Sequence, residues 1–155
     1  MAAEGLVVDA SAIVKAVLVE DGFRPFEGRT LHAPTLLWSE TLSGIAQLAW
    51  RTEISAEEAD AAVERLSVAP LTRHDSADLL RDALEIARAL GWAKTYDAEY
   101  VALARKLGLP LFSVDARLMR GIAGVTGVRR SYAGAARGLY EDVGADLDVE
   151  RHSWE

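Results

Sequence analysis

Two short apolar runs, each followed directly by an aspartate, constrain the fold more than any other feature of this sequence. Leu6–Val8 leads into Asp9, and Leu111–Val114 leads into Asp115. Neither run alternates apolar with polar residues, which is typical of strands that are buried on both faces. Such strands occur in sheets that helices cover on both sides, so the runs predict an α/β fold with a mainly parallel central sheet.

Helix patterns separate the strand candidates and support the same fold class. Apolar residues recur at helical spacing in five segments, and capping residues bound several of them. The expected helices run from Ser11 to about Glu20, from Pro34 to about Arg51, from the capping box Ser55–Glu58 to Leu66, from an N-cap at Asp75 to Leu90, and from Thr95 to Leu107. The shorter expected strands are 31–33, 68–72 at a sheet edge, and 125–129. This alternation predicts right-handed crossovers between parallel strands.

Composition excludes several classes of protein. None of the 155 residues is cysteine, which excludes a disulfide scaffold, a thiolate zinc site, an iron–sulfur cluster and a cysteine nucleophile. Half of the residues are apolar and 26% are charged, which is typical of one globular domain. The first residues show no basic segment followed by an apolar stretch, and no apolar run approaches the ~20 residues of a membrane span. We therefore expect a cytoplasmic protein without a membrane segment.

The charge of the chain is acidic overall and unevenly distributed. Its 17 Lys and Arg face 24 Asp and Glu, which gives a formal net charge of −7 and argues against sequence-independent binding of nucleic acid. Residues 115–130 reverse the sign, because the single acid Asp115 there faces four arginines: Arg117, Arg120, Arg129 and Arg130. A polyanionic substrate is therefore compatible with this chain if the attraction is local or mediated by metal.

Four carboxylates occupy positions that a parallel sheet brings to one edge. Asp9 and Asp115 follow the two strand candidates. Asp97 lies in the first turn of a predicted helix, and Glu40 lies within an apolar helical stretch. Carboxylates held close together raise one another's pKa unless a cation neutralises them, and Mg²⁺ prefers such oxygen ligands. An aspartate directly after a strand is also a common helix N-cap, and that alternative stays open here.

Four segments carry a family resemblance: Asp9–Ser11, Pro34–Glu40, Thr95–Ala104 and Ser113–Asp115. Their order and spacing resemble the PIN-domain family, and more closely the VapC-type toxins of toxin–antitoxin pairs. The resemblance spans about 6–128 and implies a PIN-like three-layer α/β/α sandwich over 1–130, with the acidic segment 131–155 peripheral to the same domain. It assigns the four acidic positions of the family to the acids named above: Asp9, Glu40, Asp97 and Asp115.

The resemblance also implies an activity and partners. The family hydrolyses RNA phosphodiesters with Mg²⁺ or Mn²⁺, here with one or two ions that the four acids would bind. The hydroxyls of Ser11, Ser113 and Thr95 would hold these ligands in position. The local positive charge of 115–130 makes its four arginines candidates for contact with RNA phosphates, and solvated surface charge is the open alternative. Glu99 is an occasional additional acid in the family, and its role is left open. The implied partners are a cognate antitoxin and a second copy of the chain, with interface candidates in the second helix: Leu42, Ile45, Leu48, Ala49 and Trp50.

Two other functions stay open at this point. A PIN-like fold without activity would bind RNA or a partner protein, although the presence of all four acids argues against a decayed site. Asp9 also resembles the nucleophile of haloacid-dehalogenase-like phosphatases, but those proteins carry a second acid two residues later, where this chain has Ser11. His32, His74 and His152 show no metal-ligand spacing, and we interpret them as isolated residues.

Overall fold

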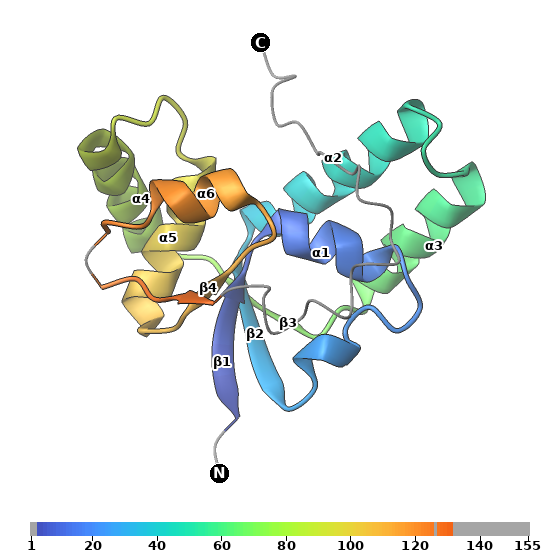
Figure 1. Ribbon diagram of the computed structural model, residues 1–155, viewed down its shortest axis with the longest axis horizontal. Coiled ribbons are helices and arrows are strands. Elements are labelled where there is room, and N and C mark those ends of the chain that lie inside the picture. The colour runs from blue at the N-terminus through green and yellow to red at the C-terminus, as the bar shows by residue number, and fades with distance from the viewer. Residues whose placement is uncertain (1–2, 126, 132–155) are drawn as a thin grey trace.

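A five-stranded parallel sheet organises the part of the chain that the computed structural model describes, residues 3–125 and 127–131 (Figure 1). The strand order is β3-β2-β1-β4-β5, and every neighbouring pair is parallel. The strands are β1 Glu4–Val8, β2 Arg29–Pro34, β3 Leu71–His74, β4 Leu111–Phe112 and β5 Arg130–Ser131. The helices are α1 Ala10–Val17, the 3-10 turn η1 Arg24–Phe26, α2 Leu36–Trp50, α3 Ala56–Ser67, α4 Ala77–Leu90, α5 Tyr96–Leu107 and α6 Ala116–Gly121.

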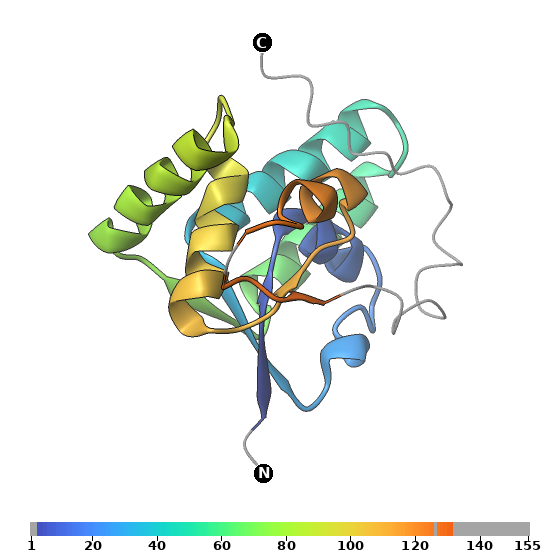
Figure 2. The same ribbon diagram turned by 60° about the vertical axis from the view of Figure 1, so that its left-hand side comes forward.

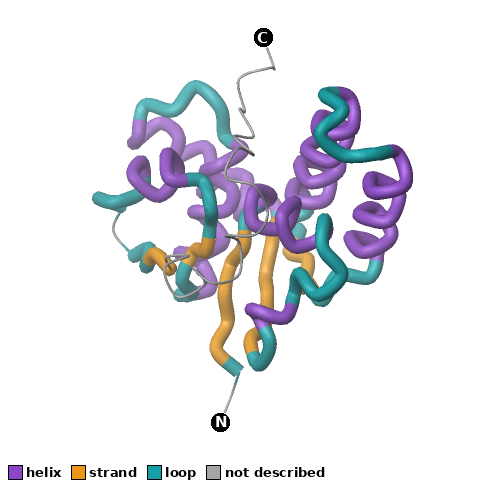
Figure 3. The backbone as a smooth tube through the Cα atoms, turned by 45° about the vertical axis from the view of Figure 1, so that its right-hand side comes forward, coloured by secondary structure: helices purple, strands orange, loops and turns teal. Residues whose placement is uncertain are grey.

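The helices form two groups with the sheet between them. Helix α2 contacts both α1 and α3, whereas α4 packs along α5. Figures 1 and 3 show α1, α2 and α3 on one side of the strands and α4, α5 and α6 on the other. The core lies on both faces of the central strand, where Leu6, Val7 and Val8 are almost completely buried. The predicted α/β sandwich with a parallel central sheet is therefore confirmed.

Local sequence signals set several helix ends as predicted. Gly91 and Gly108 end α4 and α5 in the left-handed region, with φ of 68° and 65°, where glycine has no steric penalty. The capping box at the start of α3 is complete, because Ser55 Oγ accepts from the Glu58 amide and Glu58 accepts from the Ser55 amide. These ends depend on neighbours in sequence, which makes them predictable.

Pro34 corrects one prediction. It is the last residue of β2, and α2 begins two residues later at Leu36 instead of at the proline. Pro34 is aligned with His74 of β3 but has no amide hydrogen to donate, and Thr35 N donates to His74 O at 3.2 Å instead. Pairing with the edge strand therefore extends β2 through the proline.

Other boundaries also differ from the predictions. Ser76, not Asp75, caps α4, because its Oγ accepts a hydrogen bond from Leu79 N at 3.3 Å. Among the described residues, the last strand is β5 and not the predicted 125–129, and residue 126 lies outside the described part of the chain. Helix α6 was not predicted, since its six residues are too short to display helical periodicity.

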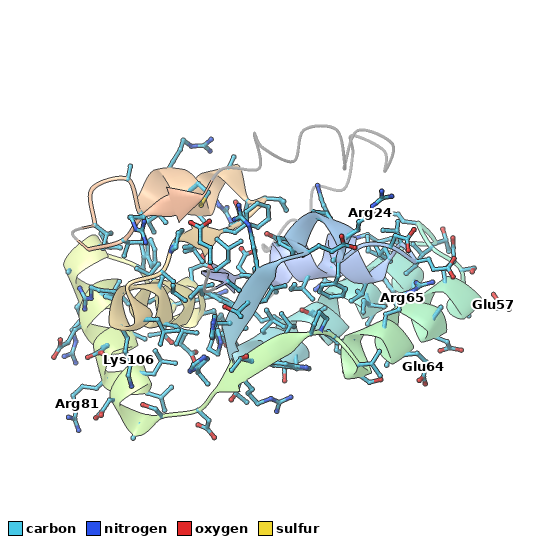
Figure 4. All side chains as sticks on the ribbon, turned by 90° about the horizontal axis from the view of Figure 1, so that it is seen from below. Arg24, Glu57, Glu64, Arg65, Arg81 and Lys106 are labelled. Carbon is cyan, nitrogen blue, oxygen red and sulfur yellow. The ribbon has the colours of Figure 1, made fainter. Side chains whose placement is uncertain are left out.

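Long side chains tie helices to their neighbours at the rim of the fold, and two of them are labelled in Figure 4. Arg65 Nη1 of α3 donates to Val17 O at the end of α1 at 2.9 Å, and Lys106 Nζ of α5 lies 3.2 Å from Ser76 Oγ. The first bond satisfies a carbonyl of the last turn of α1, which ends short of the predicted Glu20.

Among the described residues, no helix is long and apolar enough to span a membrane. The predicted acidic segment 131–155 lies outside the described residues apart from Ser131.

Candidate active site

Asp9 lies at the centre of a buried hydrogen-bond network where β1 ends. Its side chain has no exposed surface, and its Oδ1 accepts from Ser11 Oγ at 2.7 Å and from Ala12 N at 3.1 Å. Its Oδ2 accepts from Ser113 Oγ at 2.6 Å. A buried carboxylate requires such donors, and together they fix the side chain in one orientation.

Ser113 connects the ends of the two central strands. Strands β1 and β4 are neighbours, and Ser113 directly follows β4. Besides donating to Asp9, its Oγ accepts from Asp115 N at 2.9 Å and lies 3.2 Å from Ser11 Oγ. Figures 1 and 2 show the start of α6 beside the start of α1, which is where this network joins them. One hydroxyl therefore links both strand-terminal aspartates.

Both aspartates also cap the helices that follow them. Asp9 is the N-cap of α1 through its bond from Ala12 N. Asp115 Oδ1 accepts from Arg117 N at 2.9 Å and from Leu118 N at 3.2 Å at the start of α6. Both aspartates are thus helix N-caps, the alternative that the sequence left open, and the capping hydrogen bonds are made by Oδ1 of each carboxylate.

Glu40 is held by a tyrosine of the opposite helix group. Tyr100 OH donates to Glu40 Oε1 at 2.6 Å, which connects α5 to α2. The Tyr100 side chain is fully buried. Burial raises the pKa of its hydroxyl well above the ordinary value, and the charge of Glu40, the hydrogen bond to Glu40 and the charges of Asp9 and Glu99 add to the rise. Three carboxylates therefore act on one hydroxyl, which stays protonated and remains a donor.

The start of α5 brings further acids to the same edge of the sheet. Helix α5 leads into the beginning of β4, so its first turn lies near the carboxyl ends of the strands, and this turn contains Asp97 and Glu99. Both side chains are half-buried. Burial raises the pKa of Glu99 above its ordinary value, and the charge of Glu40 adds to the rise. Thr95, just before α5, makes no capping hydrogen bond with its side chain.

The acids match a hard divalent cation in donor chemistry. In the ranges that the structure describes, no three acids or histidines are grouped so that they would hold a metal ion as they stand. Their donors are all carboxylate oxygens, which Mg²⁺ and Mn²⁺ favour. The charge of Glu40 raises the pKa of Glu99, and a bound cation would oppose this rise. The residues present therefore fit such an ion.

The predicted arginines have different surroundings. Arg117 and Arg120 are exposed on α6, two and five residues after Asp115. Arg129 Nη2 donates to Gly108 O at 3.1 Å, so it supports the end of α5. The Arg130 side chain lies outside what the structure describes. Contact between these residues and RNA stays a prediction.

The predicted interface on α2 is partly wrong. Ile45 and Leu48 have 1% and 2% exposed surface, so they belong to the protein's own core. Leu42 and Trp50 are 49% and 84% exposed and Ala49 is half-buried, so these three remain candidates for contact with a second copy. The apolar pattern of a helix does not tell which part of it the same chain covers.

Two histidines interpreted as isolated form a pair. His32 of β2 and His74 of β3 approach to 3.0 Å between Nδ1 and Nε2, and His32 Nε2 lies 3.2 Å from Thr30 Oγ1. Burial lowers the pKa of His32, and the charge of His74 lowers it further. The signal that would have found the pair is the parallel pairing of the two strands, which periodicity alone does not give.

Comparisons with known proteins agree with this fold. The PIN domain family model matches residues 6–124. Ribonuclease VapC9 of Mycobacterium tuberculosis is 36% identical over 114 residues, which cover 73% of this chain and 87% of that protein. The crystal structure of PAE2754 from Pyrobaculum aerophilum has a TM-score of 0.64 at 20% identity and covers 87% of this chain and 95% of that chain. A toxin-antitoxin complex from Klebsiella pneumoniae gives a TM-score of 0.55 at 15% identity, with coverages of 79% and 94%.

The parallel α/β fold and the family match define the class of the molecule. The chain belongs to the PIN-domain family. Within that family it belongs with the VapC ribonucleases, on the identity and coverage of its relatives. The resemblance read from the sequence is thereby confirmed.

Proposed function

We propose that this chain is a Mg²⁺- or Mn²⁺-dependent endoribonuclease and the toxin of a toxin–antitoxin pair. The observation that carries the proposal is the buried carboxylate of Asp9, held by Ser11 and Ser113 at the carboxyl edge of the sheet. Helix capping requires only the bond from Ala12 N, whereas two serine hydroxyls also hold Asp9. A carboxylate that is oriented in this way, with further acids on α2 and α5, is suited to bind a cation. The family of the chain supports the same activity.

The proposed function gives each residue of the site a role. Asp9, Glu40, Asp97 and Asp115 would hold one or two ions, and Ser11 and Ser113 fix the orientation of Asp9. When bound, the ions supply activation of the attacking water and neutralisation of charge on the phosphate. Arg117 and Arg120 would contact phosphates on either side of the scissile bond, with Arg129 and Arg130 as further contacts.

The proposal includes an antitoxin as partner. The fold shared with a chain of a toxin-antitoxin complex supports it. A group of carboxylates favours an arginine of that partner, because the planar guanidinium bonds a carboxylate bidentately and keeps its charge. Antitoxin and metal would then compete for the same acids. Cytoplasmic location and a homodimer through Leu42 and Trp50 complete the proposal.

Cleavage of RNA by the purified protein tests this function. We expect cleavage with Mg²⁺ or Mn²⁺, none in EDTA, and a loss of at least 100-fold in Asp9→Asn. Asparagine keeps a cap for α1 while removing the charge. Folded wild-type protein that binds RNA without cutting it would instead indicate an inactive binding module, and turnover of small phosphate esters would indicate a phosphatase.

A further inference from the structure

The hydrogen bond from Tyr100 to Glu40 brings an uncharged side chain of the core to the candidate site. Tyr100 lies three residues after Asp97, so both project from the same face of α5. The Tyr100 ring belongs to the core, and its hydroxyl, the polar group of the side chain, donates a hydrogen bond to Glu40 Oε1 at 2.6 Å. The hydroxyl therefore reaches the candidate site from the core, and the ring that carries it is held in place by packing.

Glu40 requires a support of this kind. It projects from α2, is half-buried, and has three rotatable bonds between its backbone and its carboxylate. Fixing such a side chain costs conformational entropy each time it binds a ligand, unless another group already holds it. The oxygen bonded by Tyr100 is Oε1, so the bond defines how the carboxylate is turned. Partners of this kind around metal ligands commonly change metal affinity.

We propose that Tyr100 is a positioning residue for Glu40, which it pre-orients for binding the divalent cation. This inference rests on the proposed function, because Glu40 must be a ligand for the effect to appear. It adds a residue to the site that carries no charge and would not bind the cation itself. It also makes the site depend on the docking of one helix group against the other, since α5 supplies the donor and α2 the acceptor.

Binding of Mn²⁺ to Tyr100→Phe, measured by titration calorimetry without RNA, tests the inference. Phenylalanine keeps the buried ring and removes only the hydroxyl. We expect the Kd for Mn²⁺ to rise roughly 10- to 100-fold, the range found when partners of metal ligands are removed. Tyr96→Phe is the matched control, because Tyr96 lies on the same helix and is 48% exposed. Its Kd should equal that of the wild type.

A double-mutant cycle separates positioning from general loosening of the fold. If Tyr100 acts through Glu40, adding Tyr100→Phe to Glu40→Ala should change the remaining affinity by less than twofold. Should Tyr100→Phe fail to fold, Tyr100→Met also removes the hydroxyl and fills the core with a flexible apolar side chain, and the same rise in Kd is expected. An unchanged Kd in the folded variant, or equal effects of Tyr100→Phe with and without Glu40, overturns the inference. Wild-type protein that binds no Mn²⁺ would instead refute the proposed function.

Discussion

Replacing Ser113 with alanine should destabilise the fold, because one hydroxyl serves both strand-terminal aspartates. The variant removes the donor to Asp9 Oδ2 and the acceptor for Asp115 N. A hydrogen bond to a charged group contributes roughly 1.5–3 kcal/mol, and an amide left without a partner costs roughly 1–3 kcal/mol when buried. Asp115 is half-buried, so water can reach part of this gap. We expect a loss of about 3 kcal/mol.

Urea unfolding and thermal melts measure this loss. For a domain of this size the change corresponds to a decrease in Tm of roughly 6–12 °C. Ser113→Thr keeps the hydroxyl and should recover most of the stability. Ser39→Ala is the matched control, because Ser39 is an exposed serine of α2 and its replacement should change the free energy of unfolding by less than about 0.5 kcal/mol. A Ser113→Ala protein as stable as this control would refute the role assigned to the hydroxyl.

Three further predictions concern other parts of the molecule. The pKa of His32 is lowered in the folded protein, so the stability that the neutral side chain allows is present above about pH 6.5 and is lost as the pH falls. Between pH 7.5 and 5.5, the free energy of unfolding should therefore decrease more in the wild type than in His32→Gln. Equal decreases would contradict this prediction. Gly44→Val should cost at least about 2 kcal/mol, because a Cβ there already meets Val14 Cγ2 at 2.9 Å; unchanged urea midpoints would show that the α1–α2 contact can adjust. Light scattering should show a wild-type dimer and a Trp50→Glu monomer at micromolar concentrations, and a monomeric wild type would remove the proposed interface.

The sequence predicted those features of the fold that local signals determine. The buried central strands are unbroken apolar runs in the sequence. Gly91 and Gly108 end their helices through their own backbone conformation, which does not depend on the tertiary contacts of the residues that follow. Pro34 was misplaced because its conformation depends on β3, which lies about 40 residues later. The His32–His74 pair was missed for the same reason.

The candidate site was predictable to a similar extent. The positions of Asp9 and Asp115 after the two central strands followed from the apolar runs, whereas the binding of a cation by all four acids stays a prediction from the family resemblance. The hydrogen bond from Tyr100 to Glu40 joins residues 60 positions apart, and no periodicity reports such a contact. Tyr100 lies inside the segment Thr95–Ala104 that carries the family resemblance, yet the contact of its hydroxyl with Glu40 is apparent only from the packing of α5 near α2.

If Asp9 and Asp115 hold the cation as proposed, the helix caps that they also form have a consequence for how such a protein can lose activity over time. A lineage that replaced either aspartate with alanine would lose the charge and also a helix cap worth about 1 kcal/mol. Asparagine or serine would remove the charge and preserve the start of the helix. Inactive descendants are therefore expected to keep capping residues at these two positions. Loss of activity would then appear in their sequences as asparagine or serine in place of aspartate, and rarely as alanine.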